Sequence, residues 1–526
     1  MDQTLAQLAD LPLRRGPQLQ TGVVYHPLLG RQAYAHCPWR KDALVLLGPR
    51  AEQWVSQADG RPAVAQIQDW LGLTHTDDNQ QIATSTDPRL ASWLADVPML
   101  LRNGLLQAPP DSLPPNLAMP AKTQTQPRVF NAWLHLTNAC NLACPYCYIH
   151  KSKRHMSQHV VERVLASIEA TAASGEVERI HVRYAGGEPM LRLDVMQRFH
   201  AAALERCAQH GVQFSAAVLT NGTALQPDGV AWLKQAGVSV SVSVDGTGPL
   251  QDVMRPVVGG GSSWQRVQAG LELLLANQIV PYILITVGDS NLAGLPDLTQ
   301  WLLERQLAFR YSLVRDLEWG AGLLNDRTGA QNSPQEDLSA AALLQGPALA
   351  RLQGVLGQCY DLIEAHIAAG IAQPNHKPGW FRHSHKFCDL SPWQPIASAC
   401  GAGKSYVAIG ETGEVSPCQA ALHHPGTQPL AGESLLLLAR SQTQLQPFVR
   451  DAPNSECLQC RHRASCAGGC PLLLHRREGA VNGRSPYCEV FKAVLPRLVR
   501  IAALELAGQR YQTLRKPQPK YEESHA

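Results

Sequence analysis

The sequence predicts an α/β protein built around an open, partial (β/α)6 barrel, with a winged-helix-like domain before it and a cysteine-rich domain after it. Three observations predict this class. Six strand-like segments alternate with helical patterns between residues 129 and 317. A proline-rich stretch separates them from the front of the chain. Most of the 14 cysteines gather behind the barrel segments and on one loop within them.

Residues 1–106 form the first predicted domain, which has the size of a winged-helix domain. The stretch Thr21–Pro49 alternates apolar and polar residues, as short strands do. Helical patterns follow in three places: Ala51–Ala58, Val64–Leu71 and Asp87–Asn103. Residues 107–128 then carry six prolines among glutamine and threonine, which indicates an extended linker.

Residues 129–317 form the predicted barrel. The expected strands are Val129–Thr137, Arg179–Ala185, Gln213–Asn221, Val238–Asp245, Pro281–Val287 and Ala308–Val314. The expected helices between them are Val160–Ala173, Leu193–Gln209, Gly229–Gln235, Ser263–Asn277 and Asp297–Arg305. Repeated strand–helix alternation indicates parallel strands with right-handed crossovers. Six strands are fewer than the eight of a closed (β/α)8 barrel, so we expect an open barrel.

The rest of the chain divides into two predicted segments. Residues 318–387 connect the barrel to the end of the chain and contain one clear helical pattern, Pro347–Ala369. Residues 388–526 hold eight of the cysteines and end in a helix around Glu489–Ala507. This last segment is expected to be a separate cysteine-rich domain.

Composition excludes several classes of function. The 46 basic and 43 acidic residues leave a net charge of +3, and no basic block stands out, so nothing indicates nucleic-acid binding. No apolar run approaches the ~18 residues that a membrane span needs. The first ten residues lack the apolar core of a secretory signal. We therefore expect a cytoplasmic protein, in which dense cysteine spacing indicates metal binding or catalysis rather than disulfides.

The first cysteine group is Cys140, Cys144 and Cys147, directly after the first barrel strand. Barrel enzymes place their chemistry on such loops, at the carboxyl ends of the strands. Three thiolates on one short loop can hold an iron–sulfur cube and leave one iron open to a small molecule. A zinc site that lacks one ligand, or a set of buried structural thiols, are the alternatives.

The segment from Cys140 to Cys147 resembles the signature of the radical SAM superfamily. In that family three cysteines hold a [4Fe–4S] cluster, whose open iron chelates S-adenosylmethionine. Further positions match at the ends of successive strands. The resemblance implies that these residues contact S-adenosylmethionine: Tyr146 beside adenine, Gly186, Gly187, Glu188 and Pro189 at the methionine amino group, Asn221, and Ser243 and Arg255 at the ribose and carboxylate. A carboxylate suits an ammonium group, and a guanidinium fork suits a carboxylate.

The second cysteine group resembles the SPASM domain, which follows the barrel in many peptide-modifying relatives and holds two auxiliary [4Fe–4S] clusters. The resemblance assigns Cys400, Cys418 and Cys470 to the first, and Cys457, Cys460, Cys466 and Cys488 to the second. The resemblance leaves the fourth ligand of the first cluster unassigned, because the position that holds a cysteine in some relatives is Gln394 in this chain. Cys388 is the nearest candidate; otherwise that iron binds substrate. A pair of zinc sites is the alternative.

Residues 20–106 resemble the PqqD-like recognition element that binds the leader of a ribosomal precursor peptide as an added strand. The matching segments include Ala43–Gly48 and Ala63–Ile67. An unrelated winged-helix domain or a dimerisation cap is the alternative.

These resemblances together imply a radical SAM/SPASM maturase. Such an enzyme cleaves S-adenosylmethionine to a 5′-deoxyadenosyl radical, takes hydrogen from a peptide, and forms an intramolecular thioether, carbon–carbon or carbon–oxygen crosslink. A flavodoxin or ferredoxin would supply the low-potential electron. An anaerobic sulfatase maturase is one alternative, although those relatives carry an aspartate where this chain has Gln419. A non-catalytic iron–sulfur electron carrier is the other.

Overall fold

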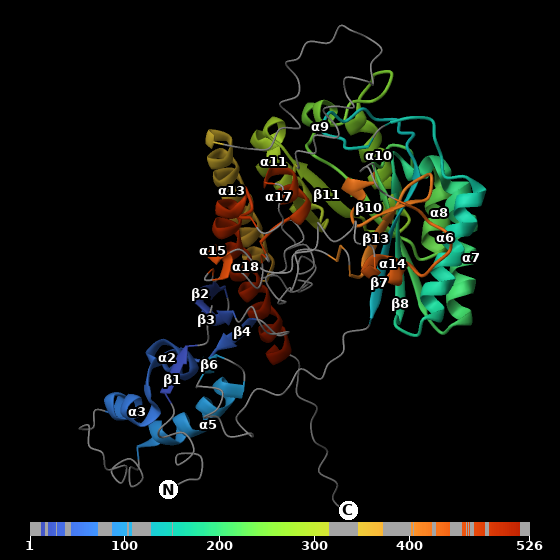
Figure 1. Cartoon of the computed structure of the whole chain (residues 1–526). Coiled ribbons are helices and arrows are strands. Elements are labelled where there is room, and N and C mark those ends of the chain that lie inside the picture. The colour runs from blue at the N-terminus through green and yellow to red at the C-terminus, as the bar shows by residue number, and fades with distance from the viewer. Residues whose placement is uncertain are drawn as a thin grey trace, which may run out of the picture.

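The fold is known from a computed structural model. It describes residues 12–15, 19–27, 29–36, 44–71, 87–102, 105–107, 128–149, 151–314, 346–371, 401–402, 404–422, 428–441, 455–458, 460, 462, 466, 468–478 and 483–515. Three regions are visible: an N-terminal region, a barrel with helices on its outer side, and a C-terminal region that contacts both (Figure 1).

Within its described residues, the N-terminal region contains two small sheets and three helices. Its elements are β1 (Pro12–Arg15), β2 (Gln20–His26), β3 (Gly30–His36), β4 (Leu44–Leu47), α2 (Pro49–Gln57), β5 (Asp59–Pro62), α3 (Ala63–Leu71), α5 (Pro88–Arg102) and β6 (Leu106–Gln107). Strands β2, β3 and β4 form one antiparallel sheet in that order, and β5, β1 and β6 form the other. The expected strands between Thr21 and Pro49 and the three expected helices are confirmed.

The barrel contains six parallel strands. They are β7 (Val129–Thr137), β8 (Arg179–Gly186), β9 (Gln213–Thr220), β10 (Ser239–Ser243), β11 (Tyr282–Val287) and β12 (Phe309–Leu313), and each pairs in parallel with the next. The intervening helices are α6 (Gln158–Ala173), η2 (Pro189–Arg192), α7 (Leu193–Gln209), α8 (Pro227–Gln235), α9 (Pro249–Met254), α10 (Ser263–Ala276), η3 (Asp289–Gly294) and α11 (Leu295–Glu304). All six expected strands and five expected helices are confirmed within a few residues.

The barrel sheet continues into the C-terminal region, which the sequence did not indicate. Strand β13 (Tyr406–Ile409) pairs in parallel with β7, and β14 (Glu414–Ser416) and β15 (Gln428–Pro429) extend the sheet to nine strands. The segment expected to form a separate domain therefore supplies three strands to the barrel sheet. The last residue of β13, Ile409, pairs with Leu134 of β7, so β13 ends close to the carboxyl end of β7.

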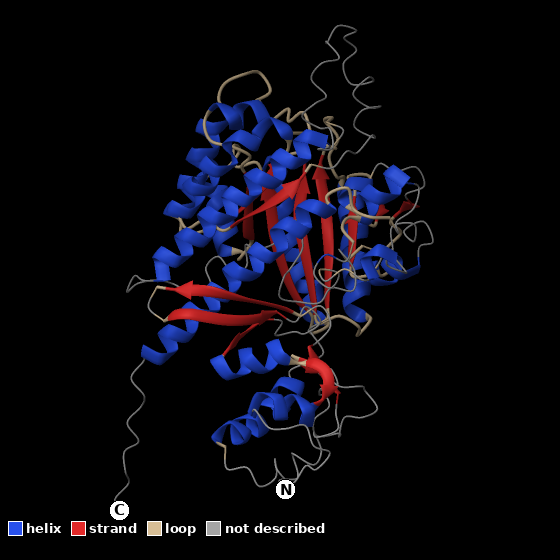
Figure 2. Ribbon diagram, turned by 90° about the vertical axis from the view of Figure 1, so that its left-hand side faces the viewer, coloured by secondary structure: helices blue, strands red, loops and turns tan. Residues whose placement is uncertain are grey.

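Two long helices join the three regions. Helix α13 (Gly346–Ile371) packs along α18 (Cys488–Arg515), and α18 also contacts β2, β3 and β4. The smaller C-terminal elements are η5 (Gln419–Ala421), α14 (Leu435–Ser441), α15 (Ser455–Leu458) and α17 (Pro471–Glu478). In Figure 2 the barrel strands stand upright, and their arrowheads point away from the N-terminal region.

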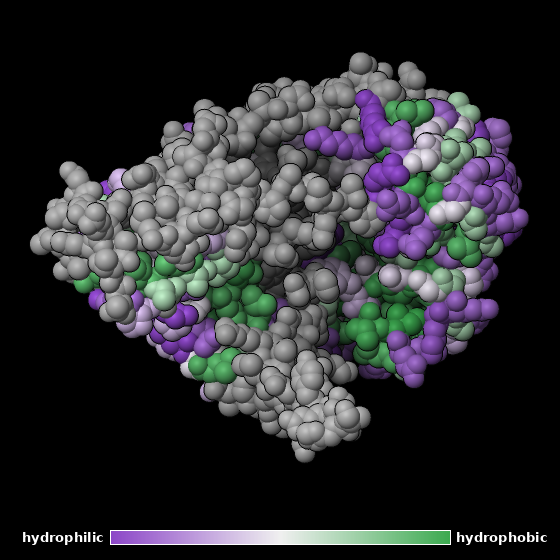
Figure 3. Space-filling model, turned by 90° about the horizontal axis from the view of Figure 1, so that it is seen from below, coloured by the Kyte–Doolittle hydropathy of each residue, from purple (hydrophilic) through white to green (hydrophobic). Residues whose placement is uncertain are grey.

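The main core lies between the barrel sheet and its helices. It continues through α13 and α18 to Val24 and Tyr34 of the sheet formed by β2, β3 and β4, which we call the N-terminal sheet. From below, the barrel side of the described surface mixes hydrophilic side chains with smaller hydrophobic areas (Figure 3). Within the described residues, no helix is both long and apolar enough to span a membrane.

Candidate active site

The three cysteines of the first group lie on the segment 138–157, which we call the cluster loop. It follows β7 and leads into α6. The thiols of Cys140, Cys144 and Cys147 are partly exposed and form no disulfides. Since parallel strands bring their carboxyl ends to one edge, the loop meets the ends of β8, β9 and β10. The expected position at the carboxyl end of the barrel is therefore confirmed.

Two glycines at the end of β8 allow the cluster loop to lie against the sheet. The amide of Gly187 donates to the carbonyl oxygen of Thr137 at 2.6 Å, and the amide of Glu188 donates to that of Ala139 at 2.9 Å. A Cβ atom on Gly187 would lie 2.1 Å from the Ala139 oxygen. Gly186 has a φ of +134°, in the region that favours glycine. The glycines are therefore required for the backbone contact that holds the loop.

Glu188 is fully buried, and its carboxylate ties the end of β8 to the end of β9. The carboxylate accepts hydrogen bonds from the amide of Met190 at 3.0 Å, the hydroxyl of Thr220 at 2.7 Å and the amide of Asn221 at 2.8 Å. Burial raises the pKa of this carboxyl, while the hydrogen bonds act to lower it. The side chain is thus engaged within the protein, and its expected contact with a methionine amino group stays a prediction.

Asn221 connects β9 to the cluster loop. Its amide nitrogen donates to the side chain of Asn141 at 2.8 Å and approaches the sulfur of Cys140 at 3.8 Å. On its other side the loop pairs with the segment after Arg255, since the amide of Ala143 donates to the carbonyl of Pro256 at 2.7 Å. The loop is therefore fixed from both sides near its first two cysteines.

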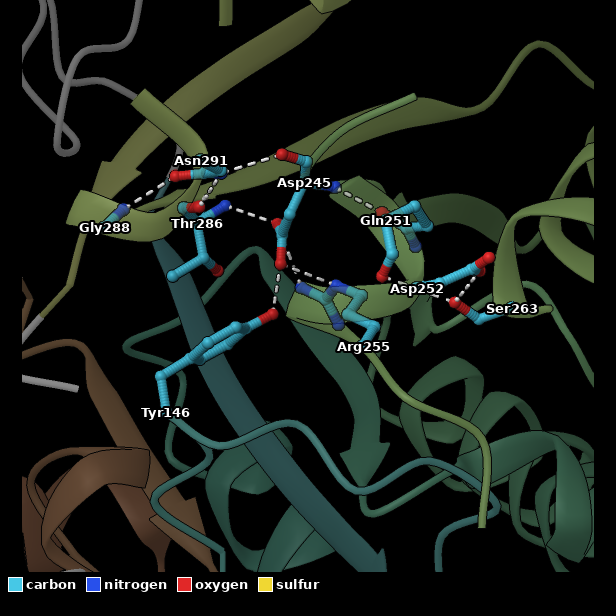
Figure 4. Close-up of polar contacts among 9 residues, drawn as sticks. All are labelled: Tyr146, Asp245, Gln251, Asp252, Arg255, Ser263, Thr286, Gly288 and Asn291. Atoms are coloured by element: carbon cyan, nitrogen blue, oxygen red, sulfur yellow. Dashed lines mark hydrogen bonds and ion pairs between the residues drawn. The ribbon is translucent and has the colours of Figure 1, made fainter. Parts of the chain in front are cut away.

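A buried carboxylate, that of Asp245, binds both Tyr146 and Arg255 (Figure 4). These are the two residues furthest apart in sequence among those expected to contact S-adenosylmethionine. Asp245, just beyond β10, forms an ion pair with Arg255 at 2.8 Å. It also accepts a hydrogen bond from the hydroxyl of Tyr146. The guanidinium carbon of Arg255 lies 5.5 Å from the centre of the Tyr146 ring, within cation–π range.

The positive charge of Arg255 balances the negative charge of the Asp245 carboxylate. Burial acts to lower the pKa of Arg255, but the Asp245 carboxylate and neighbouring groups raise it above its ordinary value, so the guanidinium is always charged. Burial raises the pKa of Tyr146 well above its ordinary value, which keeps its hydroxyl protonated as a donor. Ser243, at the end of β10, is partly exposed at the same edge of the sheet.

Burial also raises the pKa values of two thiols of the cluster loop. It raises the pKa of Cys144 to about 11, against the opposing effect of the Arg255 charge, and it raises the pKa of Cys140 as well. Protons would therefore remain on these two thiols at neutral pH unless a metal replaces them.

Comparison with known proteins identifies the family. Residues 134–302 match the model of the radical SAM superfamily. Over 342 residues the chain is 31% identical to the serine-type anaerobic sulfatase-maturating enzyme of Klebsiella aerogenes, covering 64% of this chain and 78% of that enzyme. The chain belongs to the radical SAM superfamily. It is therefore an enzyme, which argues against the electron-carrier alternative.

Two further comparisons extend the likeness of this radical SAM enzyme. Over 369 residues it is 28% identical to the mycofactocin maturase MftC of Mycobacterium ulcerans, covering 67% of this chain and 86% of that one. The solved structure of histidine-tagged anSMEcpe with bound AdoMet matches with a TM-score of 0.57 at 15% identity, covering 73% of this chain and 99% of that one. This structural match supports the radical SAM fold.

Enzymes of this superfamily use S-adenosylmethionine and a [4Fe–4S] cluster, and the cluster loop has the donors for such a cluster. Within the described ranges, no three His, Cys, Asp or Glu side chains lie close enough together to hold a single metal ion. A four-iron cluster binds its thiolates at separate corners, so its cysteines stand further apart than the ligands of one ion. Three partly exposed thiols on one loop are the donors that such a cluster needs.

The cysteines expected to hold the second auxiliary cluster come together in this structure. Cys457, Cys460 and Cys488 line a cavity of about 290 Å³ with His462 and Arg484. Burial raises the pKa of Cys466 to about 12, and the three cavity thiols act in the same direction. Three of the four expected ligands therefore line one cavity, and the fourth thiol lies near enough to interact with them electrostatically.

The cysteines expected to hold the first auxiliary cluster are only partly described. Cys418 and Cys470 pack against the same small apolar group, Ala420, Ala421 and Leu472. Cys400 and Cys388 lie outside the described residues, as does Cys37. Cys207 and Cys359 are fully buried in the main core, where they pack as small hydrophobic residues.

Sequence reasoning missed one group beside the site. Glu411, in the turn between β13 and β14, is 3% exposed and accepts a hydrogen bond from the side chain of Asn138 in the cluster loop at 2.6 Å. Arg154 of the same loop lies 3.4 Å from this carboxylate. Asn138 and Glu411 are 273 residues apart in sequence, and no local pattern indicates their contact.

Proposed function

We propose that this radical SAM enzyme is a SPASM-type maturase that forms an intramolecular crosslink in a ribosomal precursor peptide. The observation that carries the proposal is the position of the N-terminal sheet. The sheet packs directly on α18, and α18 begins at Cys488, one of the cavity thiols. A helix of 28 residues is about 42 Å long, so one element connects the sheet with the cysteine-lined cavity.

The N-terminal sheet has the properties of a strand-adding peptide site. One face packs its Ala33, Ala35 and Leu47 against the helices α2 and α5, and the other face packs on α18. Within the described residues, no strand pairs with the outer edge of β2 or of β4. Backbone groups at such an edge can bind an extended peptide. We propose that the leader of the precursor binds there.

The cluster loop would hold the [4Fe–4S] cluster through Cys140, Cys144 and Cys147. Cys457, Cys460, Cys466 and Cys488 would hold one auxiliary cluster, and Cys400, Cys418 and Cys470 the other, with Cys388 as a candidate fourth ligand. When bound, the first cluster and S-adenosylmethionine supply the hydrogen-abstracting radical, with an electron from a flavodoxin or ferredoxin. The protein itself orients the peptide and excludes water from the barrel mouth.

An anaerobic assay of 5′-deoxyadenosine formation tests the first part of the proposal. The full chain, reconstituted with iron and sulfide, should form 5′-deoxyadenosine from S-adenosylmethionine, and Cys144→Ala should not. Cys207→Ala is the matched control, because this thiol is buried in the core away from the loop. Turnover by Cys144→Ala equal to that of the control would refute the cluster assignment.

Mass spectrometry of a co-expressed precursor peptide tests the second part. Each crosslink removes one pair of hydrogens, and fragment ions should be missing between the joined residues. A peptide of unchanged mass in the presence of an active enzyme would contradict the proposed reaction.

Sulfatase maturation is the second candidate, and the likeness to the Klebsiella enzyme favours it. Against it stands Gln419, where the resemblance implies an aspartate base. The Gln419 side chain accepts a hydrogen bond from Tyr406 at 2.6 Å and cannot act as a carboxylate base. An aldehyde-reactive hydrazide separates the candidates, since formylglycine reacts with it and a crosslink does not.

A further inference from the structure

The Asp245 carboxylate binds a side chain from the cluster loop, Tyr146, and a side chain from the segment after β10, Arg255 (Figure 4). It is 0% exposed. One carboxylate oxygen accepts the amide of Thr286 at 2.7 Å and Nη2 of Arg255 at 3.3 Å. The other accepts Nε of Arg255 at 2.8 Å and the hydroxyl of Tyr146. A carboxylate has about four acceptor positions, and all four are occupied.

The backbone of Asp245 is fixed as firmly as its side chain. Its amide donates to the side chain of Gln251 at 2.8 Å, and its carbonyl accepts from Asn291 at 2.7 Å. Asn291 also donates to the carbonyl of Thr286 at 2.9 Å. The carboxylate therefore occupies one position, set by the end of β10, by α9, β11 and η3, and cannot move without breaking several buried hydrogen bonds.

This rigid carboxylate determines the orientation of two groups that would otherwise be adjustable. Tyr146 lies between Cys144 and Cys147, so the bond to its hydroxyl orients a ring of the cluster loop. Arg255 has five N–H donors, and two of them bind Asp245. Three donors remain, which is enough to receive a second carboxylate while the ion pair with Asp245 stays intact.

We propose that Asp245 is a positioning residue for S-adenosylmethionine. It holds the Tyr146 ring and the free edge of the Arg255 guanidinium in the orientation that receives the nucleoside and the methionine carboxylate. The inference rests on the membership of the chain in the radical SAM superfamily and not on the peptide substrate. It therefore stands or falls separately from the proposed crosslinking reaction.

The test compares Asp245→Asn with the matched control Asp252→Asn in the full, anaerobically reconstituted chain. Asp252 undergoes the same chemical change nearby, but it binds the start of α10 through Ser263 and the amide of Trp264 and touches neither Tyr146 nor Arg255. Iron content and the electron paramagnetic resonance spectrum of the reduced cluster, recorded without S-adenosylmethionine, report whether the loop is assembled. The binding constant and the spectral change on adding S-adenosylmethionine report the positioning.

We expect Asp245→Asn to keep its iron and its cofactor-free spectrum but to bind S-adenosylmethionine roughly 10- to 100-fold more weakly, as when a group that orients a ligand-binding side chain is removed. Asp252→Asn should bind it normally. Unchanged affinity in Asp245→Asn, or an equal loss in both variants, would overturn the proposal.

Tyr146→Phe decides the question if Asp245→Asn does not accumulate as folded protein. This variant leaves the ion pair of Asp245 and Arg255 intact and removes only the hydroxyl donor. Its affinity for S-adenosylmethionine should fall roughly five- to tenfold, the effect of one hydrogen bond. A Tyr146→Phe enzyme with unchanged affinity and unchanged spectra would overturn the inference.

Discussion

Substitution of Glu188 tests whether this motif glutamate serves the framework of the site or the cofactor. The resemblance to the superfamily implies a contact with the methionine amino group. In the structure, the carboxylate has no exposed surface and accepts three hydrogen bonds, from Met190, Thr220 and Asn221. Glu188→Ala would remove the acceptor of all three donors at once, at the point where β8 and β9 end.

The size of the effect follows from these contacts. A buried donor without an acceptor costs about 1–3 kcal/mol, so three donors would cost about 3–9 kcal/mol. Water entering the space left by the side chain would satisfy some of them, which favours the lower end, about 3 kcal/mol. Domains have a free energy of unfolding of only about 5–15 kcal/mol. We therefore expect Glu188→Ala to destabilise the barrel substantially even when no cofactor is present.

Urea unfolding of the cofactor-free protein, followed by circular dichroism, measures this effect. The midpoint for Glu188→Ala should fall by about 1 M or more. Glu205→Ala, an exposed change on α7, should leave it within about 0.5 kcal/mol of the original stability. If Glu188→Ala unfolds at the original midpoint but no longer binds S-adenosylmethionine, the carboxylate acts on the cofactor and the framework argument is wrong.

Three further predictions concern the surroundings of the site. Gly187→Ala should displace the cluster loop and lower the iron content after reconstitution, because its Cβ would meet a loop carbonyl at 2.1 Å; Gly354→Ala, in open space on α13, should not. Burial, with the neighbouring arginines of β8, lowers the pKa of His181 to about 4, so the unfolded chain binds more protons than the folded one between about pH 4 and 6.5. Stability should therefore fall by up to about 2 kcal/mol as pH drops through that window, and His181→Gln should lose this part of the pH dependence in thermal unfolding. Glu411→Ala should release iron to a chelator faster than the unaltered enzyme does. Glu411→Gln keeps an acceptor for Asn138 and should release iron more slowly than Glu411→Ala. Equal rates in the two variants would argue that this contact does not hold the cluster loop in place.

Local patterns in the sequence were sufficient for the barrel. The strands of the barrel alternate with amphipathic helices, and this period depends only on neighbouring residues, so their bounds were predicted within a few positions. The cysteines at 140, 144 and 147 follow β7 directly, and the parallel order of the strands brings their loop to the edge where β8 and β9 end. The position of the cysteine-bearing loop was therefore predictable before any tertiary contact was known.

The tertiary structure alone decided how the parts of the chain meet. The pairing of β13 with β7, the ion pair of Asp245 with Arg255 and the packing of the N-terminal sheet on α18 each join segments that have no shared local pattern. Such contacts depend on backbone hydrogen bonds and buried charges that form only when distant segments fold against each other. The sequence by itself determined which residues carry the thiols and the strand-end groups, while the long-range contacts determined their orientation, because an ion pair or an added strand leaves no periodic trace in the chain.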